Sequence, residues 1–313
     1  MKRAFVTGGS GFVGGRLIEV LVERGVEVIA LARSDASATT VVARGARAAR
    51  GDLDDTAALA AGMAGCDTCF HCAAHTDQWD PVEVHMRITT RGTEHVLAAA
   101  KSTGVSRVVH VGTEAVLADG HPIVRADETR PLPAHPMGAY PLTKGLAEVA
   151  AVAAGAVVIR PRFVWGTGDT NLLPEFVDAV NAGRFAWIGG GHYLTSTCHV
   201  DNVVEGLLLG AERGVPGSIY FVTDGEPVEF RDFITKLLAT RGVAPGSRSL
   251  PRWLARAAVS LTAWMKRPPL TRTAFALMAH EVTVDDRKAR RELGYLGRMS
   301  IADGLAAMRG RSA

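Results

Sequence analysis

Short apolar runs alternate with stretches of helical spacing along the first half of the chain. The runs are AFVT (4–7), VEVIALA (26–32), DTCFHCAA (67–74), RVVHVG (107–112) and AVVIRP (156–161). Strands that alternate with helices of this length predict a parallel sheet with helices on both faces. We therefore expect an α/β fold built on a doubly wound parallel sheet.

The pattern changes after about residue 162, where Gly/Pro-rich pieces such as GTGDTN, IGGGH and RGVPGS separate short apolar segments. Such punctuation predicts short strands and helices without regular alternation. We expect residues 1–165 to form the sheet domain and residues 166–313 to form mainly a smaller, mixed α/β substrate lobe, with some later segments returning to the sheet.

A glycine-rich turn, TGGSGFVGG (7–15), follows the first expected strand and opens the first expected helix. In that context Gly8 permits a tight turn, Gly11 lets the backbone approach a pyrophosphate, and Gly14 allows close packing. Free N–H groups and the helix dipole would hold the phosphates. The turn predicts a Rossmann-type dinucleotide site, with Thr7, Gly8, Ser10, Gly11, Phe12, Val13 and Gly14 as its residues.

The end of the second expected strand bears on the choice of nicotinamide cofactor. An acidic residue there would favour NAD(H), whereas an arginine accommodates the 2′-phosphate of NADP(H). This chain has Arg33 and no carboxylate before Asp35. We expect NADP(H), with NAD(H) left open, and we expect Asp52 and Leu53 beside the adenine.

Candidate acid–base chemistry lies in AYPLTKG, where Tyr140 and Lys144 stand four apart on an expected helix and therefore share a face. A neighbouring ammonium should lower the tyrosine pKa from its reference value of ~10. Thr113 follows the fifth expected strand, where a hydroxyl could hold a substrate oxygen.

The stretch CDTCFHCAAH (66–75) raises the question of a metal site. Successive side chains of a strand point to opposite faces, so Cys66, Cys69 and Cys72 should not converge on one ion. We expect them to pack as small apolar residues, with no metal bound. Four cysteines without a leader-like start fit reduced thiols in the cytoplasm.

Five segments together resemble the extended short-chain dehydrogenase/reductase superfamily. They are TGGSGFVG, HCAAH, YPLTK, RPRFVWGTGD and HVDN. Segments such as NLLPEFVDAVNAGR and EVTVDDRKARRELGY are most similar to the 3β-hydroxysteroid dehydrogenase group, which includes 2-alkyl-3-ketoalkanoate reductases. The resemblance adds further cofactor-binding residues: Cys72, Ala73, Ala74, Tyr140, Lys144, Pro161 and Arg162.

The same resemblance implies the reaction. Hydride would pass between nicotinamide and a carbonyl carbon, Tyr140 would transfer the proton, Lys144 would bind the ribose, and Thr113 would orient the carbonyl. Two departures matter, because Gly112 replaces the usual serine and Glu114 is not part of the Asp-Glu pair of dehydratases. We expect an NADP(H)-dependent oxidoreductase acting on a ketone or secondary alcohol. An NAD-dependent sugar-nucleotide epimerase and a non-catalytic NADP-binding sensor are the alternatives.

The substrate should be a small, hydrophobic ketone or alcohol, of the 3-ketosteroid or 2-alkyl-3-oxoacyl type. The candidate substrate contacts are His75, Trp79, Glu114, Val164, Trp165 and Trp187. The segment WLARAAVSLTAWM (253–265) is too short to cross a bilayer. A lid or core packing is favoured for it over peripheral contact with a membrane.

The charge distribution limits the classes of partner that the chain is expected to bind. The formal net charge is +3, yet residues 248–313 hold 13 Lys+Arg against 5 Asp+Glu, a balance of +8. These cations are not interleaved with exposed aromatics, so we expect no nucleic-acid partner. A homodimer is compatible with the resemblance.

Overall fold

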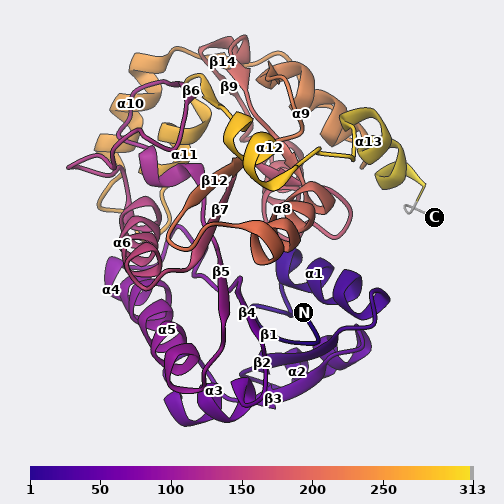
Figure 1. The fold of residues 1–313 in the computed structure, drawn as a ribbon. Helices are drawn as coiled ribbons and strands as arrows, with labels where there is room; N and C mark the ends of the chain where they lie inside the picture. The colour runs from indigo at the N-terminus through magenta and orange to yellow at the C-terminus, as the bar shows by residue number, and fades with distance from the viewer. Residues whose placement is uncertain (311–313) are drawn as a thin grey trace.

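The computed structural model describes residues 1–310 and contains the expected doubly wound sheet. Seven parallel strands pair in the order β12-β7-β5-β4-β1-β2-β3 (Figure 1). Their bounds are β1 (Arg3–Thr7), β2 (Glu27–Ala32), β3 (Arg47–Arg50), β4 (Thr68–His71), β5 (Arg107–Val111), β7 (Val157–Pro161) and β12 (Ile219–Val222). The Rossmann-type fold class is thereby confirmed.

Helices cover both faces of this sheet, which explains why its strands are continuous apolar runs. One face carries α1 (Phe12–Glu23), α2 (Asp35–Ala43), α8 (Val200–Arg213) and α12 (Arg287–Leu293). The other carries α3 (Thr56–Met63), α4 (Val82–His85), the π-helix η1 (Met86–Arg91), α5 (Gly92–Ser102) and α6 (Ala139–Ala153). Strand β1 shows the alternation: Val6 packs with Leu17 of α1, whereas Phe5 packs with Leu59 of α3.

A second lobe lies over the carboxyl ends of the sheet strands. Its four-stranded sheet has the order β13-β10-β15-β6. The strands of this lobe are β6 (Ile123–Ala126), β8 (Val164–Trp165), β9 (Trp187–Ile188), β10 (Leu194–Thr195), β11 (Cys198–His199), β13 (Val228–Glu229), β14 (Ser249–Leu250) and β15 (Val282–Val284). Its helices are η2 (Glu114–Leu117), α7 (Leu172–Asn181), η3 (Gly189–Gly191), α9 (Phe230–Ala239), α10 (Arg252–Leu261), α11 (Arg272–Met278) and α13 (Ile301–Arg309).

The chain passes between the two lobes more than once. Strand β12 and helix α8 follow residue 165 in sequence yet belong to the large sheet and its cover. Strand β6 precedes residue 165 but pairs with β15 in the small sheet. Segments from both sides of that position therefore build both lobes, and the cleft between them is lined from both parts of the chain.

The cysteines in the 66–72 stretch lie on two sides of β4. Cys69, within the strand, shares a cluster with Cys66, whereas Cys72 packs against the opposite cluster. The expectation that all three alternate was wrong for Cys66, because β4 begins only at Thr68. Burial raises the pKa of the Cys69 and Cys72 thiols, that of Cys72 to about 12. Within residues 1–310, no group of three or more His, Cys, Asp or Glu could hold a metal ion.

The described part of the chain has no helix long and apolar enough to cross a membrane.

Candidate active site

The glycine turn joins β1 to α1 at the carboxyl edge of the large sheet. Gly8 has φ +70°, and a Cβ there would lie 2.7 Å from the Ala73 nitrogen. A Cβ at Gly14 would lie 2.4 Å from the Gly8 oxygen, so helix and turn are in direct contact. A Cβ at Gly11 would meet only the Gly8 oxygen, at 3.3 Å, and its other side is open. That open backbone at a helix N-terminus fits a pyrophosphate.

A cleft of about 750 Å³ begins at this turn and runs between the two lobes. It brings together nearly all of the expected cofactor residues. Those lining it are Gly8, Ser10, Gly11, Phe12, Val13, Gly14, Arg33, Asp52, Leu53, Cys72, Ala73, Ala74, Tyr140, Lys144, Pro161 and Arg162. Thr7 is instead fully buried beneath it, where its Oγ1 accepts a hydrogen bond from the Ala73 nitrogen (3.2 Å). Thr7 therefore supports the turn and does not face the cleft.

The end of β2 presents a cation to the cleft. Arg33 is exposed, lines the cleft together with Ser37, and forms no ion pair with any described carboxylate. The nearby Asp35 does not line the cleft; its Oδ1 lies 2.8 Å from Arg50 Nη2 at the surface. The local charge at this position is therefore positive.

Tyr140 and Lys144 occupy the first turns of α6 and both line the cleft. Lys144 Nζ is buried, donates to the Val111 carbonyl oxygen (2.5 Å), and lies 3.3 Å from His110 Nε2. Burial lowers the pKa of Lys144 to about 8, and Glu148 opposes the fall. The Lys144 ammonium is thus held by the last carbonyl of β5.

The pKa of Tyr140 moves opposite to the expected lowering by Lys144. Burial and then the Glu114 carboxylate raise it to about 12, against a smaller lowering by a hydrogen bond with Thr113. Burial is the largest of these causes, and the Lys144 ammonium donates to the Val111 carbonyl oxygen. A tyrosine with a raised pKa keeps its proton at neutral pH and can donate it.

Thr113 and Glu114 follow β5 after one residue, Gly112. Thr113 Oγ1 accepts from the Ala115 nitrogen (3.2 Å) and donates to Glu114 Oε2 (2.9 Å). Glu114 is 3% exposed and pairs with Arg162, whose Nη1 lies 2.7 Å from its Oε1. Glu114 is therefore a buried residue of the cleft wall.

The expected substrate contacts divide into two groups. His75, Trp79, Glu114 and Val164 line the cleft. Trp165 and Trp187 do not; they are 0% and 1% exposed in the aromatic core of the second lobe. In the two-residue strand β8, Val164 takes the cleft face and Trp165 the opposite one. The Trp165 indole instead donates to Asp224 Oδ2 (2.7 Å), and that of Trp187 to the Gly246 oxygen (3.0 Å).

Two helices of the second lobe contribute cleft residues that the sequence interpretation missed. They are Leu172, Pro174, Glu175 and Asp178 on α7, and Thr273, Ala274, Leu277 and Met278 on α11. The sequence of α7 contributes to the family resemblance through NLLPEFVDAVNAGR, but its spacing alone assigned no residue to the site. Helical spacing puts one face of each helix on the cleft, but that face can be identified only once the lobe is folded.

Comparison with known proteins agrees with this geometry. The model of the 3-beta hydroxysteroid dehydrogenase/isomerase family matches residues 5–252. A 4-hydroxy-2-methyl-3-oxo-4-farnesyl-3,4-dihydroquinoline-1-oxide ketoreductase of Stigmatella aurantiaca is 49% identical over 98% of this chain and 96% of its own. A 2-alkyl-3-oxoalkanoate reductase of Stenotrophomonas maltophilia is 32% identical over 99% of both chains.

A solved structure has the same fold. The dTDP-glucose 4,6-dehydratase DesIV from Streptomyces venezuelae, with NAD and TYD bound, superposes with a TM-score of 0.77 at 27% identity, covering 98% of this chain and 96% of that one. The glycine turn, the Tyr140–Lys144 pair and the match over most of the chain agree. The protein belongs to the 3-beta hydroxysteroid dehydrogenase/isomerase family and is an oxidoreductase of the extended short-chain dehydrogenase/reductase superfamily.

Proposed function

We propose that this protein is an NADP(H)-dependent ketoreductase that converts a ketone on a hydrophobic substrate into a secondary alcohol. One observation carries the proposal: Tyr140, Lys144 and Thr113 border the same cleft as the glycine turn. A non-catalytic sensor would need the turn but not these three groups. The cytoplasmic location, inferred from four free thiols, stays part of the proposal.

The cofactor residues divide by the part of the dinucleotide they would hold. The open backbone at Gly11 suits the pyrophosphate, and Lys144 is placed for the nicotinamide ribose. The free Arg33 guanidinium, with the Ser37 hydroxyl beside it, suits a 2′-phosphate, which supports NADP(H) over NAD(H). When bound, the nicotinamide supplies the hydride.

The chain's own residues supply the proton and the orientation. Tyr140, protonated at neutral pH, donates its phenolic proton to the carbonyl oxygen as negative charge develops there. The Thr113 hydroxyl donates its one proton to Glu114 Oε2 (2.9 Å), and it orients the carbonyl oxygen by turning that proton to the substrate.

The walls of the cleft indicate the kind of substrate. Apolar side chains from both lobes line the cleft, among them Trp79, Phe163, Leu172, Leu277 and Met278. The carboxylates of Asp77, Glu114, Glu175 and Asp178 also line the cleft, while Arg162 is paired with Glu114 and the Lys144 ammonium is bound to the Val111 carbonyl oxygen. A free carboxylate on the substrate would meet repulsion. We therefore favour a neutral ketone with a large apolar group, as in the name of the Stigmatella relative, over an alkyl-oxoalkanoate.

A homodimer belongs to the same proposal. Leu146 and Val149 on α6 are 41% and 55% exposed, on the outer side of the helix that carries Tyr140. An apolar helix surface of this kind is typical of a subunit contact. Sedimentation analysis of the protein and of a Val149→Lys variant would test it.

The decisive experiment is loss of NADPH absorbance with a panel of neutral cyclic ketones, 3-ketosteroids and 3-oxoalkanoates, run with wild type and Tyr140→Phe. We expect turnover of a neutral ketone that the variant loses by about a thousandfold, while NADPH still binds. Equal turnover in the variant would remove Tyr140 from its role. NADPH binding without turnover of any ketone by wild type would support the sensor alternative.

A further inference from the structure

The segment that contains α10 has its small side chains inward and its large ones outward. Ala255 and Val259 pack with Phe275 and Ala279 of the α11 region. The outward side chains are Trp253, Leu254, Leu261, Trp264 and Met265, exposed by 72%, 40%, 73%, 85% and 40%. Their exposure shows that core packing does not account for this segment. We call these five residues the α10 apolar surface.

The charge around the α10 apolar surface is of one sign. Residues 248–280 hold six Lys and Arg and no Asp or Glu. Arg256, Lys266, Arg267 and Arg272 are exposed, and none of them forms an ion pair with a described carboxylate. Several exposed arginines elsewhere have acidic partners, such as Arg87 with Asp54. The surface therefore combines exposed indole and aliphatic groups with uncompensated cations.

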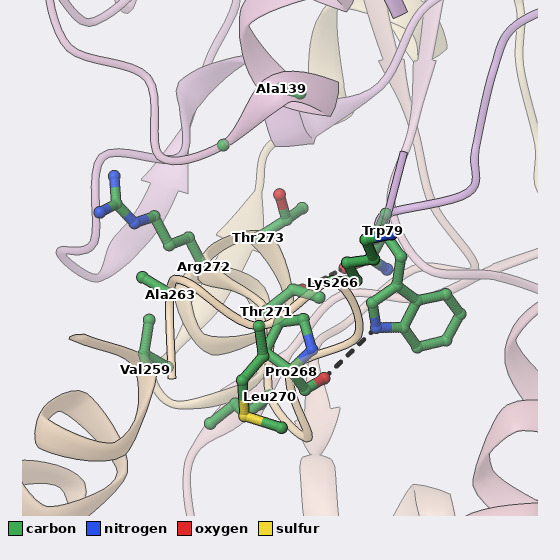
Figure 2. A pocket seen from close by; sticks show the side chains of 13 residues that line it. Trp79, Ala139, Val259, Ala263, Lys266, Pro268, Leu270, Thr271, Arg272 and Thr273 are labelled. Carbon is green, nitrogen blue, oxygen red and sulfur yellow. Dashed lines mark hydrogen bonds between the residues drawn. The ribbon is translucent and has the colours of Figure 1, made fainter. Parts of the chain in front are cut away.

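This surface adjoins the active site. A cavity of about 240 Å³ lies between the α10–α11 segment and the start of α6, lined by Val259, Ala263, Met265 and Ala139 among others (Figure 2). Gln78, Trp79 and Thr273 line both this cavity and the main cleft. Figure 2 shows the Trp79 indole directed at the Pro268 carbonyl oxygen, a hydrogen bond of 3.3 Å. Thr271 Oγ1 donates to Gln78 Oε1 (2.5 Å) across the same junction.

We propose that the α10 apolar surface docks on anionic lipid bilayers, with its exposed cations meeting the headgroups. Tryptophan, leucine and basic residues on a helix too short to span are the composition of an interfacial anchor. Cations close to an anionic leaflet strengthen such binding. A second copy of this chain fits less well, because a symmetric contact would bring two such clusters of cations together.

The position of the α10 apolar surface determines how the docked molecule would be oriented on the bilayer. Helices α10 and α11 lie at the end of the molecule remote from β3 (Figure 1), so the sheet domain would point away from the bilayer. A lipid-dissolved ketone would reach the cleft past Trp79 and the 266–271 loop. This second step rests on the proposed function, whereas docking itself needs no turnover.

The test is co-flotation of the full chain with phosphatidylcholine vesicles that contain phosphatidylglycerol, and with pure phosphatidylcholine vesicles. We expect binding to the anionic vesicles that weakens as salt rises. Trp253→Ser/Trp264→Ser and Lys266→Glu/Arg267→Glu should each weaken it by roughly tenfold or more.

Matched controls replace similar residues far from the surface. Leu296→Ser removes another exposed apolar side chain, and Arg24→Glu/Arg47→Glu reverses two cations near the amino ends of β2 and β3. Both should bind vesicles as the wild type does. The proposal is overturned if the wild type ignores anionic vesicles, or if the surface variants bind like the controls. A change of oligomeric state in the Trp253→Ser/Trp264→Ser variant, without vesicle binding by the wild type, would assign the surface to a second copy.

Discussion

Arg162 Nη1 lies 2.7 Å from Glu114 Oε1, and both side chains are buried at the wall of the cleft beside Tyr140. Arg162 also donates to the Leu277 carbonyl oxygen (2.8 Å) at the end of α11, so the pair joins the two lobes. The Glu114 carboxylate, together with burial, raises the pKa of Tyr140. The ion pair thus links the assembly of the cleft to the acidity of Tyr140, the proposed proton donor.

Replacing Glu114 by Gln removes the negative charge beside Tyr140, so the Tyr140 pKa should fall. Reduction uses the protonated phenol, so activity is lost as pH rises through that pKa. The alkaline limb of kcat/KM for ketone reduction should therefore move to lower pH in the variant. Glu175→Gln, at another cleft carboxylate, is the control and should leave the limb in place.

The same Glu114→Gln change should destabilise the protein, because it leaves the Arg162 guanidinium buried without its partner. A broken buried pair typically costs about 3 kcal/mol. Urea unfolding of the two proteins measures the difference. An unchanged midpoint would show that the pair contributes nothing to holding the lobes together.

Lys144 predicts a pH dependence of stability. Its pKa is lowered from 10.5 to about 8, so between those values the unfolded chain binds more protons than the folded one. The contribution of Lys144 to stability should therefore rise from pH 8 to pH 10, by up to about 3 kcal/mol. Subtracting the unfolding free energies of Lys144→Met from those of the wild type isolates this slope. A flat difference would mean that Lys144 is not desolvated.

Two helical glycines offer a matched pair of substitutions. In Gly14→Ala the new Cβ would lie 2.4 Å from the Gly8 oxygen, so the turn must shift, and NADPH affinity should fall by roughly tenfold or more. In Gly145→Ala the nearest atom is 3.7 Å away, and the helix should gain up to about 1 kcal/mol. Calorimetric titration with NADPH and thermal melting separate the two effects. Equal NADPH affinity in both variants would show that a Cβ at Gly14 does not displace the Gly8 turn.

Arg33→Ala tests the cofactor choice. Loss of a cation that faces the 2′-phosphate should weaken the binding of NADPH by about tenfold, while the affinity for NADH should change little. Arg50→Ala is the control, since Arg50 pairs with Asp35 outside the cleft. If Arg33→Ala weakens the binding of NADPH and NADH equally, Arg33 contacts a part of the dinucleotide that both cofactors share.

The features that could be predicted from sequence are local ones. A glycine turn after a strand depends on the φ angle of Gly8 and the space at Gly14, and both belong to a few neighbouring residues. Tyr140 and Lys144 share a helix face because they stand four apart. The apolar runs give the strands because a sheet covered on both faces needs them.

The remaining features depend on contacts between distant segments. Trp165 and Val164 are neighbours in sequence, yet only packing of the second lobe decides which one meets the cleft. The Tyr140 pKa rises because burial and the Glu114 carboxylate outweigh the hydrogen bond with Thr113. The sequence by itself determined the sheet, the glycine turn and the shared helix face of Tyr140 and Lys144, because each rests on short-range geometry. Tertiary structure alone decided the charge around Tyr140, the cleft face of the second lobe and the exposure of α10, because burial and electrostatics depend on which distant groups are brought together.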